Sequence, residues 1–279
     1  MIIKNVLASG ISALMLLSVV FGVALNVSKV RGGGIIYIRA DGSVEGTDKI
    51  QRVGNVYTFT DNINDSIVVE KDNIIIDGAG YALQGTWGIG LNLAYRSNVT
   101  IKSIVIKNFD YGIYFFCSQN NIISGNTITN NGIGVWLYAS SNNSISGNNI
   151  ANNGIGLYLE DSSSNKFHHN NFINNTHQVY DYSWDHNLCP PSINVWDKGY
   201  PSGGNYWSDY AGVDLYSGPY QNETGSDEIG DTPYIIDNNN RDRYPLIPEF
   251  SINIIPPLAL AMLTSIAIIT REKKTKNRM

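Results

Sequence analysis

Residues 124–134 read SGNTITNNGIG, and residues 146–156 read SGNNIANNGIG. The two stretches lie 22 positions apart, and the same period continues more faintly through His168-His169-Asn170 and Asn174-Asn175. A fixed period just above 20 residues, with no helical pattern inside it, is typical of a solenoid built from β-strands. The sequence therefore predicts an all-β fold, a single-stranded parallel β-helix with 22-residue coils.

The repeat also predicts which side chains point inward, because residues 22 apart lie above one another if each period forms one coil. Apolar residues recur at five such positions, and alternation along each strand separates inward from outward positions. The predicted inward columns are Ile101, Ile123, Ile145 and Phe167; Ile106, Ile128, Ile150 and Phe172; Tyr111, Ile133 and Ile155; Ile113, Val135, Leu157 and Val179; and Phe115, Leu137 and Leu159.

Asparagine and glycine lie between the short apolar runs, where the chain must turn. Both residues tolerate left-handed backbone angles, so they suit the corners of each coil. The stacked residues Asn126, Asn148 and Asn170 are expected to form an internal ladder, in which each side-chain amide bonds to the one above it.

The repeat sets the expected division of the chain. Three apolar runs at 35–38, 56–59 and 67–69 lie outside the 22-residue register and predict an N-terminal cap. About five coils follow, which at roughly 4.8 Å per coil give a rod of roughly 24 Å. Both ends need covering, since the open ends of a parallel sheet invite further pairing. The expected segments are a cap at 33–72, repeats at 73–185 and an irregular aromatic and acidic segment at 186–250.

Both ends of the chain are hydrophobic. Residues 1–27 hold an apolar run behind Lys4 and predict a signal peptide cleaved near Ala24, or an uncleaved N-terminal anchor. Residues 252–270 form a second apolar run, long enough for a transmembrane helix, and the basic tail at 271–279 predicts a cytoplasmic C-terminus. A buried helix is the alternative for the second run. The protein is therefore expected in the cell membrane, with its main domain extracellular.

Charge and cysteine content restrict the partners and the chemistry. Residues 25–251 hold 13 Lys and Arg against 23 Asp and Glu, a net charge of −10. An acidic segment of this kind argues against nucleic acid as a partner. The two cysteines, Cys117 and Cys189, permit one disulfide, and a free thiol at Cys117 is the alternative.

The run at 194–210, NVWDKGYPSGGNYWSDY, combined with the Asn and Gly repeats, resembles the NosD-like proteins. That family consists of right-handed parallel β-helices carrying the carbohydrate-binding and sugar-hydrolysis repeat, and membrane-anchored versions are common in archaea. The resemblance covers about residues 33–250 and implies the right-handed fold. The family name comes from a periplasmic factor for copper-enzyme maturation, a role that does not transfer with the repeat alone.

An aromatic column lies one residue out of phase with the predicted core. It comprises Tyr114, Trp136, Tyr158 and Tyr180, and alternation places it on the outside of one face. Flat rings with polar edges suit the apolar faces and hydroxyl groups of sugars, so this column is the candidate carbohydrate site. The alternative is that Trp196, Tyr206 and Trp207 fold back and cover the column.

Carboxylates are concentrated in a glycine-rich stretch near the C-terminus. Oxygen ligands on flexible loops are what Ca²⁺ requires, although the spacing matches no EF-hand, and turn formation is the alternative explanation. The candidate calcium ligands are Asp209, Asp214, Asp227, Asp231 and Asp237. No other cofactor is expected.

The coils offer no convergent catalytic set. The acidic residues Asp110, Glu160 and Asp161 fall at different registers, so no catalytic residue is assigned. Adjacent histidines such as His168 and His169 in a polar turn are more often solvated than bound to copper. The expected function is carbohydrate binding, with a polysaccharide or surface glycan as partner, or a role in surface structure. A polysaccharide-active lyase, epimerase or hydrolase is the alternative.

Overall fold

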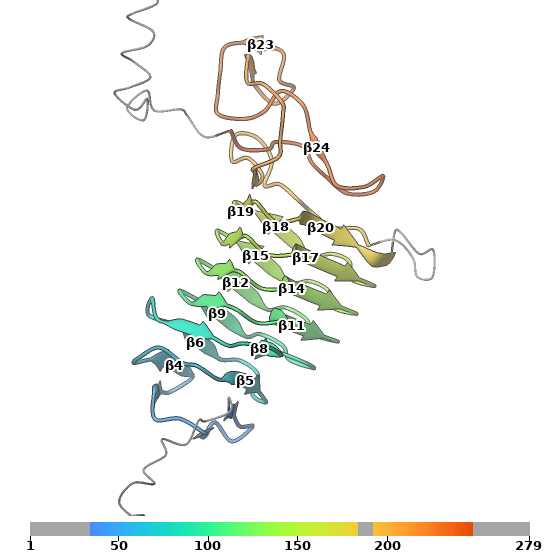
Figure 1. Cartoon of the computed structure of the whole chain (residues 1–279). Helices are drawn as coiled ribbons and strands as arrows, with labels where there is room; N and C mark the ends of the chain where they lie inside the picture. The colour runs from blue at the N-terminus through green and yellow to red at the C-terminus, as the bar shows by residue number, and fades with distance from the viewer. Residues whose placement is uncertain (1–33, 184–191, 248–279) are drawn as a thin grey trace, which may run out of the picture.

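The computed structural model describes residues 34–183 and 192–247. These residues form a right-handed parallel β-helix of about six turns, followed by a C-terminal segment on the end of the rod (Figure 1). Each repeat coil contributes one strand to each of three sheets, here called A, B and C. The predicted all-β solenoid with 22-residue coils is confirmed.

Sheet A holds the longest strands. Its order is β2-β1-β5-β8-β11-β14-β17-β20, and every pair is parallel except β1 with β2. The strands are β1 (Ile35–Ile38), β2 (Val44–Glu45), β5 (Ser66–Val69), β8 (Ile89–Asn92), β11 (Tyr111–Phe116), β14 (Ile133–Tyr138), β17 (Ile155–Glu160) and β20 (His177–Asp181).

Sheets B and C are built from shorter strands. Sheet B, in the order β18-β15-β12-β9-β6-β4-β3, comprises β3 (Ile50–Val53), β4 (Val56–Phe59), β6 (Ile75–Asp77), β9 (Thr100–Lys102), β12 (Ile122–Ser124), β15 (Ser144–Ser146) and β18 (Lys166–His168). Sheet C, in the order β21-β19-β16-β13-β10-β7, comprises β7 (Ala82–Gln84), β10 (Val105–Lys107), β13 (Thr127–Thr129), β16 (Asn149–Ala151), β19 (Asn171–Ile173) and β21 (Tyr206–Trp207). Two small hairpins follow, β22 (Tyr216–Ser217) with β23 (Glu223–Thr224) and β24 (Tyr234–Ile235) with β25 (Arg241–Asp242).

The predicted core columns of sheets B and C are confirmed. Ile123 pairs with Ile145 and Ile145 with Phe167, while Ile128 pairs with Ile150 and Ile150 with Phe172. All of these side chains are fully buried. Stacking like on like lets each coil bury its apolar side chains against its neighbours, which a single coil cannot do.

One predicted inward column is wrong. Tyr111, Ile133 and Ile155 are half-buried, and the Tyr111 ring contacts that of Trp136 on the outer side of sheet A. The next residue in each coil is a buried glycine, and a Cβ at Gly134 would lie 2.6 Å from the carbonyl oxygen of Gly156. Two successive residues therefore face inward, and the alternation assumed from sequence shifts by one position.

The asparagine ladder is confirmed, and two more accompany it. Asn148 Oδ1 accepts hydrogen bonds from the backbone N–H and the side-chain amide of Asn126, both at 3.0 Å, and Asn148 Nδ2 donates to Asn170 Oδ1 at 3.0 Å. The same pattern joins Asn121, Asn143 and Asn165, and again Asn131, Asn153 and Asn175. The ladders satisfy buried backbone groups at the corners, where strand pairing is interrupted.

Exposed corner residues take left-handed backbone angles, as the composition indicated. Asn130 and Asn152 both have φ of 55° and Asn108 has φ of 62°. Asparagine adopts this region at lower cost than most residues, so its abundance is explained by two tasks, turning the chain and bonding the interior.

The region predicted as an N-terminal cap extends the solenoid. Its strands β4 and β5 pair in parallel with β6 and β8, so only β2 and β3 run antiparallel at the edges of the sheets. The pairs Ile36 with Ile67 and Ile67 with Leu91 have separations other than 22. The connections between these strands differ in length from those of the regular coils, so the 22-residue period is absent from this part of the sequence although the coil is present.

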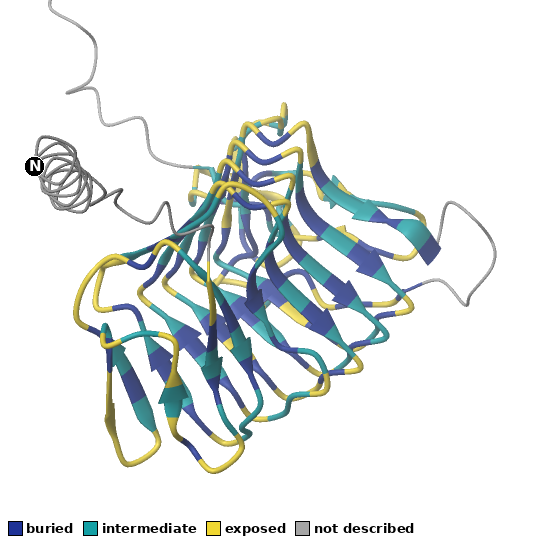
Figure 2. Cartoon of the chain, turned by 60° about the horizontal axis from the view of Figure 1, so that its bottom comes forward, coloured by how far each residue is buried: buried dark blue, intermediate teal, exposed yellow. Residues whose placement is uncertain are grey.

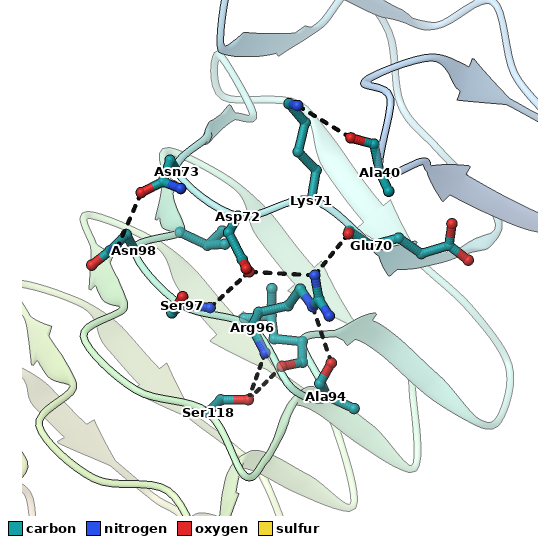
Figure 3. A network of polar contacts seen from close by, with 12 residues as sticks. Ala40, Glu70, Lys71, Asp72, Asn73, Ala94, Arg96, Ser97, Asn98 and Ser118 are labelled. Atoms are coloured by element: carbon teal, nitrogen blue, oxygen red, sulfur yellow. Dashed lines mark hydrogen bonds and ion pairs between the residues drawn. The ribbon is translucent and has the colours of Figure 1, made fainter.

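Arg96 joins three successive coils at one corner (Figure 3). Its Nη1 donates to the carbonyl oxygen of Glu70 at 2.7 Å and lies 3.3 Å from Asp72 Oδ1. The same Asp72 oxygen accepts the backbone N–H of Ser97 at 2.9 Å, and the backbone N–H of Arg96 donates to Ser118 Oγ at 3.2 Å. The irregular first coils are thereby tied to the regular repeats.

The C-terminal segment covers the end of the core. The Trp207 ring is sandwiched between Phe172, with centroids 4.5 Å apart, and Tyr234, with centroids 4.2 Å apart, and Trp196 stacks on Phe167 at 4.5 Å. Figure 1 shows this segment beyond β18 and β19, at the end of the rod. The stretch that resembled the NosD-like proteins therefore includes residues that close the hydrophobic core.

The ladders continue into this cap with changed spacing. Asn170 Nδ2 donates to Asn205 Oδ1 at 3.0 Å, and Asn165 Nδ2 donates to Asn194 Oδ1 at 3.1 Å. Asn205 in turn donates to Asp242, and the backbone N–H of Asn194 donates to Asn240 Oδ1 at 2.9 Å. The polar interior of the rod thus ends on side chains from the last hairpin.

The predicted signal peptide or anchor, the transmembrane helix at 252–270 and the basic tail lie outside the described residues. Within the ranges 34–183 and 192–247, the structure contains no helix with the length and apolar character needed to cross a bilayer.

Candidate functional site

The outer face of sheet A carries the aromatic column expected from the sequence. We call Tyr114, Trp136, Tyr158 and Tyr180 the aromatic stripe; they come from β11, β14, β17 and β20 and are direct neighbours in the strand register. Successive ring centroids are 5.1, 5.3 and 5.3 Å apart. All four residues are half-buried, and Figure 2 shows half-buried and buried positions alternating along such strands.

Further rings widen this surface. Tyr111 contacts Trp136 at 5.0 Å, and Phe116 contacts Tyr138 at 5.1 Å in the column on the other side of the stripe. The inward glycine after Tyr111 produces this arrangement, because it places both Tyr111 and Tyr114 on the outer face. The result is a continuous aromatic surface that runs along the rod.

The hydroxyl groups of Tyr114 and Tyr158 are neutral at physiological pH. Burial first, and then the negative charge of Glu160, raise the pKa of Tyr158 to about 12. Burial also raises the pKa of Tyr114. A neutral phenol both donates and accepts hydrogen bonds. The stripe therefore combines apolar ring faces with hydroxyl groups suited to a polyol ligand.

Among the described residues, Trp196, Tyr206 and Trp207 do not cover the aromatic stripe. Trp196 and Trp207 pack on Phe167 and Phe172 at the end of the core, and Tyr206 pairs with Asn171 in sheet C. In the ranges 34–183 and 192–247, the rings that contact the stripe belong to sheet A, apart from Tyr182 just after it.

A pocket of about 680 Å³ adjoins this surface at the N-terminal end of the rod. Its lining includes Ile89 and Asn92 of β8, which pair with Tyr111 and Tyr114. Trp87 stands at the pocket with 72 % of its surface exposed. We call this cavity the Trp87 pocket.

Sequence reasoning did not identify the Trp87 pocket. The corner between β7 and β8 has four residues, 85–88, whereas the equivalent corners 108–110 and 130–132 have three. The additional residue allows Trp87 to lie exposed at the surface. The backbone N–H of the next residue, Gly88, donates to Asp110 Oδ2 at 2.7 Å. An irregularity in the repeat was visible here, but its consequence for the surface depends on the course of the backbone.

The five aspartates considered for calcium each accept hydrogen bonds from protein groups. Asp214 accepts the backbone N–H groups of Asp227 and Glu228, and Asp231 accepts those of Leu215 and Tyr216. Asp227 accepts from Ile229, Asp237 accepts from Asn239 and Asn240, and Asp209 accepts from Gln178 and Tyr234. The described part of the chain contains no group of three or more acidic, histidine or cysteine side chains placed to hold a metal ion. The structure therefore does not bring the five together: Asp227 and Asp237 stabilise local turns, while Asp209, Asp214 and Asp231 join segments that are distant in the sequence.

The chain matches a known protein family over most of its length. The model of the family described as "Periplasmic copper-binding protein (NosD)" matches residues 16–212 of this chain. The chain belongs to the NosD family. The match spans the regular coils, the aromatic stripe and the cap residues Trp196 and Trp207. No curated protein and no solved structure matches this NosD-family chain.

The described residues of this NosD-family protein do not fit a copper site. Copper requires histidine, methionine or cysteine side chains gathered at one place. His168 and His169 are adjacent, but His169 Nε2 lies 2.7 Å from the carbonyl oxygen of Ser202, and His177 lies on sheet A rather than beside them. Burial lowers the pKa of His168. Cys117 is exposed beyond the end of β11, and Cys189 lies outside the described residues.

Proposed function

We propose that this protein works outside the cytoplasm as a carbohydrate-binding β-helix, with a polysaccharide lying on the aromatic stripe. The observation that carries the proposal is the column of half-buried rings on consecutive coils, with centroids 5.1 to 5.3 Å apart. Sugar rings have apolar faces that pack on such side chains, and the phenol hydroxyls supply hydrogen bonds at the edges.

The location outside the cytoplasm is supported by two observations. The family description contains the word periplasmic. The chain also begins with an apolar run behind a single lysine, the pattern of a secretion signal. Copper binding, the other element of the family description, is not part of the proposal because the described histidine and cysteine residues are dispersed.

Affinity electrophoresis of the full-length protein tests the proposal. Native gels containing a neutral β-glucan, an α-mannan or polygalacturonate are run with wild type, Trp136→Ala and Trp136→Phe. We expect at least one polysaccharide to retard the wild type, Trp136→Ala to weaken retardation about tenfold, and Trp136→Phe to retain part of it. Tyr220→Ala, which removes a side chain exposed by 84 %, is the control. Equal retardation of Trp136→Ala and wild type would overturn the proposal.

The same incubations separate binding from catalysis and from a passive surface role. New reducing ends or unsaturated products would favour the polysaccharide-active enzyme. Absence of both retardation and turnover across the panel would favour a surface-structure component.

A further inference from the structure

The Trp87 pocket and the aromatic stripe form one surface. The pocket is lined by Asn92 of β8, and Asn92 is the register neighbour of Tyr114, the first ring of the stripe. A ligand that followed the stripe toward the N-terminus would therefore enter the pocket. The pocket volume, about 680 Å³, falls in the range that encloses small ligands.

The pocket has the composition of a sugar subsite. Trp87 is 72 % exposed and offers an indole ring to a ligand. The pocket lining also includes four polar residues, Asn64, Ser66, Thr86 and Asn108. An aromatic platform with a few polar groups is the arrangement that fixes the orientation of a polar ligand with apolar faces.

The charge of the whole surface restricts the class of glycan that it can bind. None of the sheet A strands β1, β5, β8, β11, β14, β17 and β20 contains lysine or arginine. The pocket lining has no basic residue either, and Asp65 is its single acidic one. Carboxylate and sulfate groups are recognised chiefly by arginine and lysine. A uronate or sulfated polymer would thus find no lysine or arginine on these strands or in the pocket lining, and Asp65 would repel it.

The geometry points to the Trp87 pocket as the subsite for the terminal residue of a neutral glycan whose chain lies on the aromatic stripe. The inference rests on the proposed function and adds two properties, recognition of a chain end and selection against anionic sugars. In this arrangement the last sugar unit lies against Trp87 in the corner at 85–88, and the stripe holds the units behind it.

Binding of short and long ligands distinguishes the pocket from the stripe. The full-length wild type, Trp87→Ala, Trp136→Ala and Tyr220→Ala are titrated by calorimetry with neutral hexasaccharides of glucose, mannose and N-acetylglucosamine. They are also compared on gels containing the corresponding long polymers, with polygalacturonate and dextran sulfate as the anionic arm. Circular dichroism checks that the exposed Trp87 is dispensable for folding.

We expect Trp87→Ala to weaken hexasaccharide binding about tenfold. Retardation by the long polymers should be largely kept, because a long polymer offers few chain ends. Trp136→Ala should weaken both. An unchanged hexasaccharide affinity in Trp87→Ala, with a loss in Trp136→Ala, would overturn the pocket assignment and leave the proposed function standing. Tighter binding of the anionic polymers would overturn the charge argument. Wild type that binds no glycan, or an unaffected Trp136→Ala, would remove the proposed function itself.

Discussion

Asp242 Oδ2 accepts the backbone N–H of Asn205 at 2.6 Å, so a carboxylate forms the last rung of a ladder otherwise made of amides. The same oxygen accepts the Trp207 indole N–H at 3.0 Å, and Oδ1 accepts the backbone N–H of Tyr244 at 3.1 Å. A Cβ at Gly204 would lie 1.8 Å from Oδ1, so only glycine leaves room for this side chain. Asp242 thereby fixes the last hairpin, the tryptophan cap and the ladder to one another.

Burial raises the pKa of Asp242 to about 6, and the hydrogen bonds that it accepts oppose this shift without cancelling it. Because the folded pKa lies above the unfolded value, the contribution of this group to stability is fully present below about pH 4. It is lost as the pH rises through about 6. We predict that the unfolding free energy of wild type, minus that of Asp242→Asn, falls by on the order of 2–3 kcal/mol between pH 4 and pH 7.

Urea denaturation of both proteins across this pH range makes the measurement. Subtracting the variant cancels the opposite effect of His168, whose lowered pKa favours the fold at higher pH. Parallel pH profiles for the two proteins would contradict the assignment of a raised pKa to Asp242.

The ladder of Asn126, Asn148 and Asn170 is predicted to contribute strongly to stability. Asn148→Ala would leave the backbone N–H of Asn126 and the carbonyl of Ile123 without their buried partners. Each unsatisfied group costs about 1–3 kcal/mol, so the unfolding free energy should fall by about 2–5 kcal/mol in chemical denaturation. Asn171→Ala, an exposed site one residue after the next rung, should change it by about 0.5 kcal/mol or less. Equal effects at the two sites would count against the ladder.

Trp207 is predicted to be essential to the cap. Its ring is 1 % exposed and lies between Phe172 and Tyr234, so Trp207→Ala should lower the unfolding free energy by about 3–5 kcal/mol. Near-ultraviolet circular dichroism and urea denaturation report the loss. Tyr220→Ala removes an exposed aromatic ring of the same C-terminal segment and should leave stability nearly unchanged. Wild-type stability in Trp207→Ala would show that the cap does not close the core.

The inward glycine of each repeat coil is predicted to resist substitution. Gly134→Ala would place a methyl group 2.6 Å from the carbonyl oxygen of Gly156, in backbone that cannot move without disturbing the next coil. A loss of about 1–3 kcal/mol in unfolding free energy is expected. The control is Gly147→Asn, at a corner with φ of 67° and no atom near the added Cβ, where asparagine should be tolerated. Similar losses at both positions would contradict the steric argument.

The sequence predicted those features that repeat. The 22-residue period gave the coil, the columns headed by Ile101 and Ile106, the Asn126 ladder and the stripe, because identical side chains stack wherever the register is constant. The period did not predict the outward position of Tyr111. Strict alternation along the strand allows only every second residue to face inward, whereas Gly134 and Val135 both do, as do the equivalent residues of the neighbouring coils.

Features outside the period were not predictable in the same way. The strands before residue 73 join the solenoid through connections of other lengths, and Asn205 and Asp242 continue a ladder at separations of 35 and 37 residues. Such contacts depend on where the loops return in space. The Trp87 pocket was missed for the same reason, because its walls come from several coils.

Hydroxyl-radical footprinting of the full-length protein, with and without the neutral polysaccharide that retards it most, tests whether the polysaccharide lies on the aromatic stripe. Oxidation of Tyr114, Trp136 and Tyr158 is expected to fall when the polysaccharide is present, while that of Tyr220 on the C-terminal segment stays unchanged. Protection confined to the C-terminal segment, with the aromatic stripe oxidised equally in both samples, would contradict that placement.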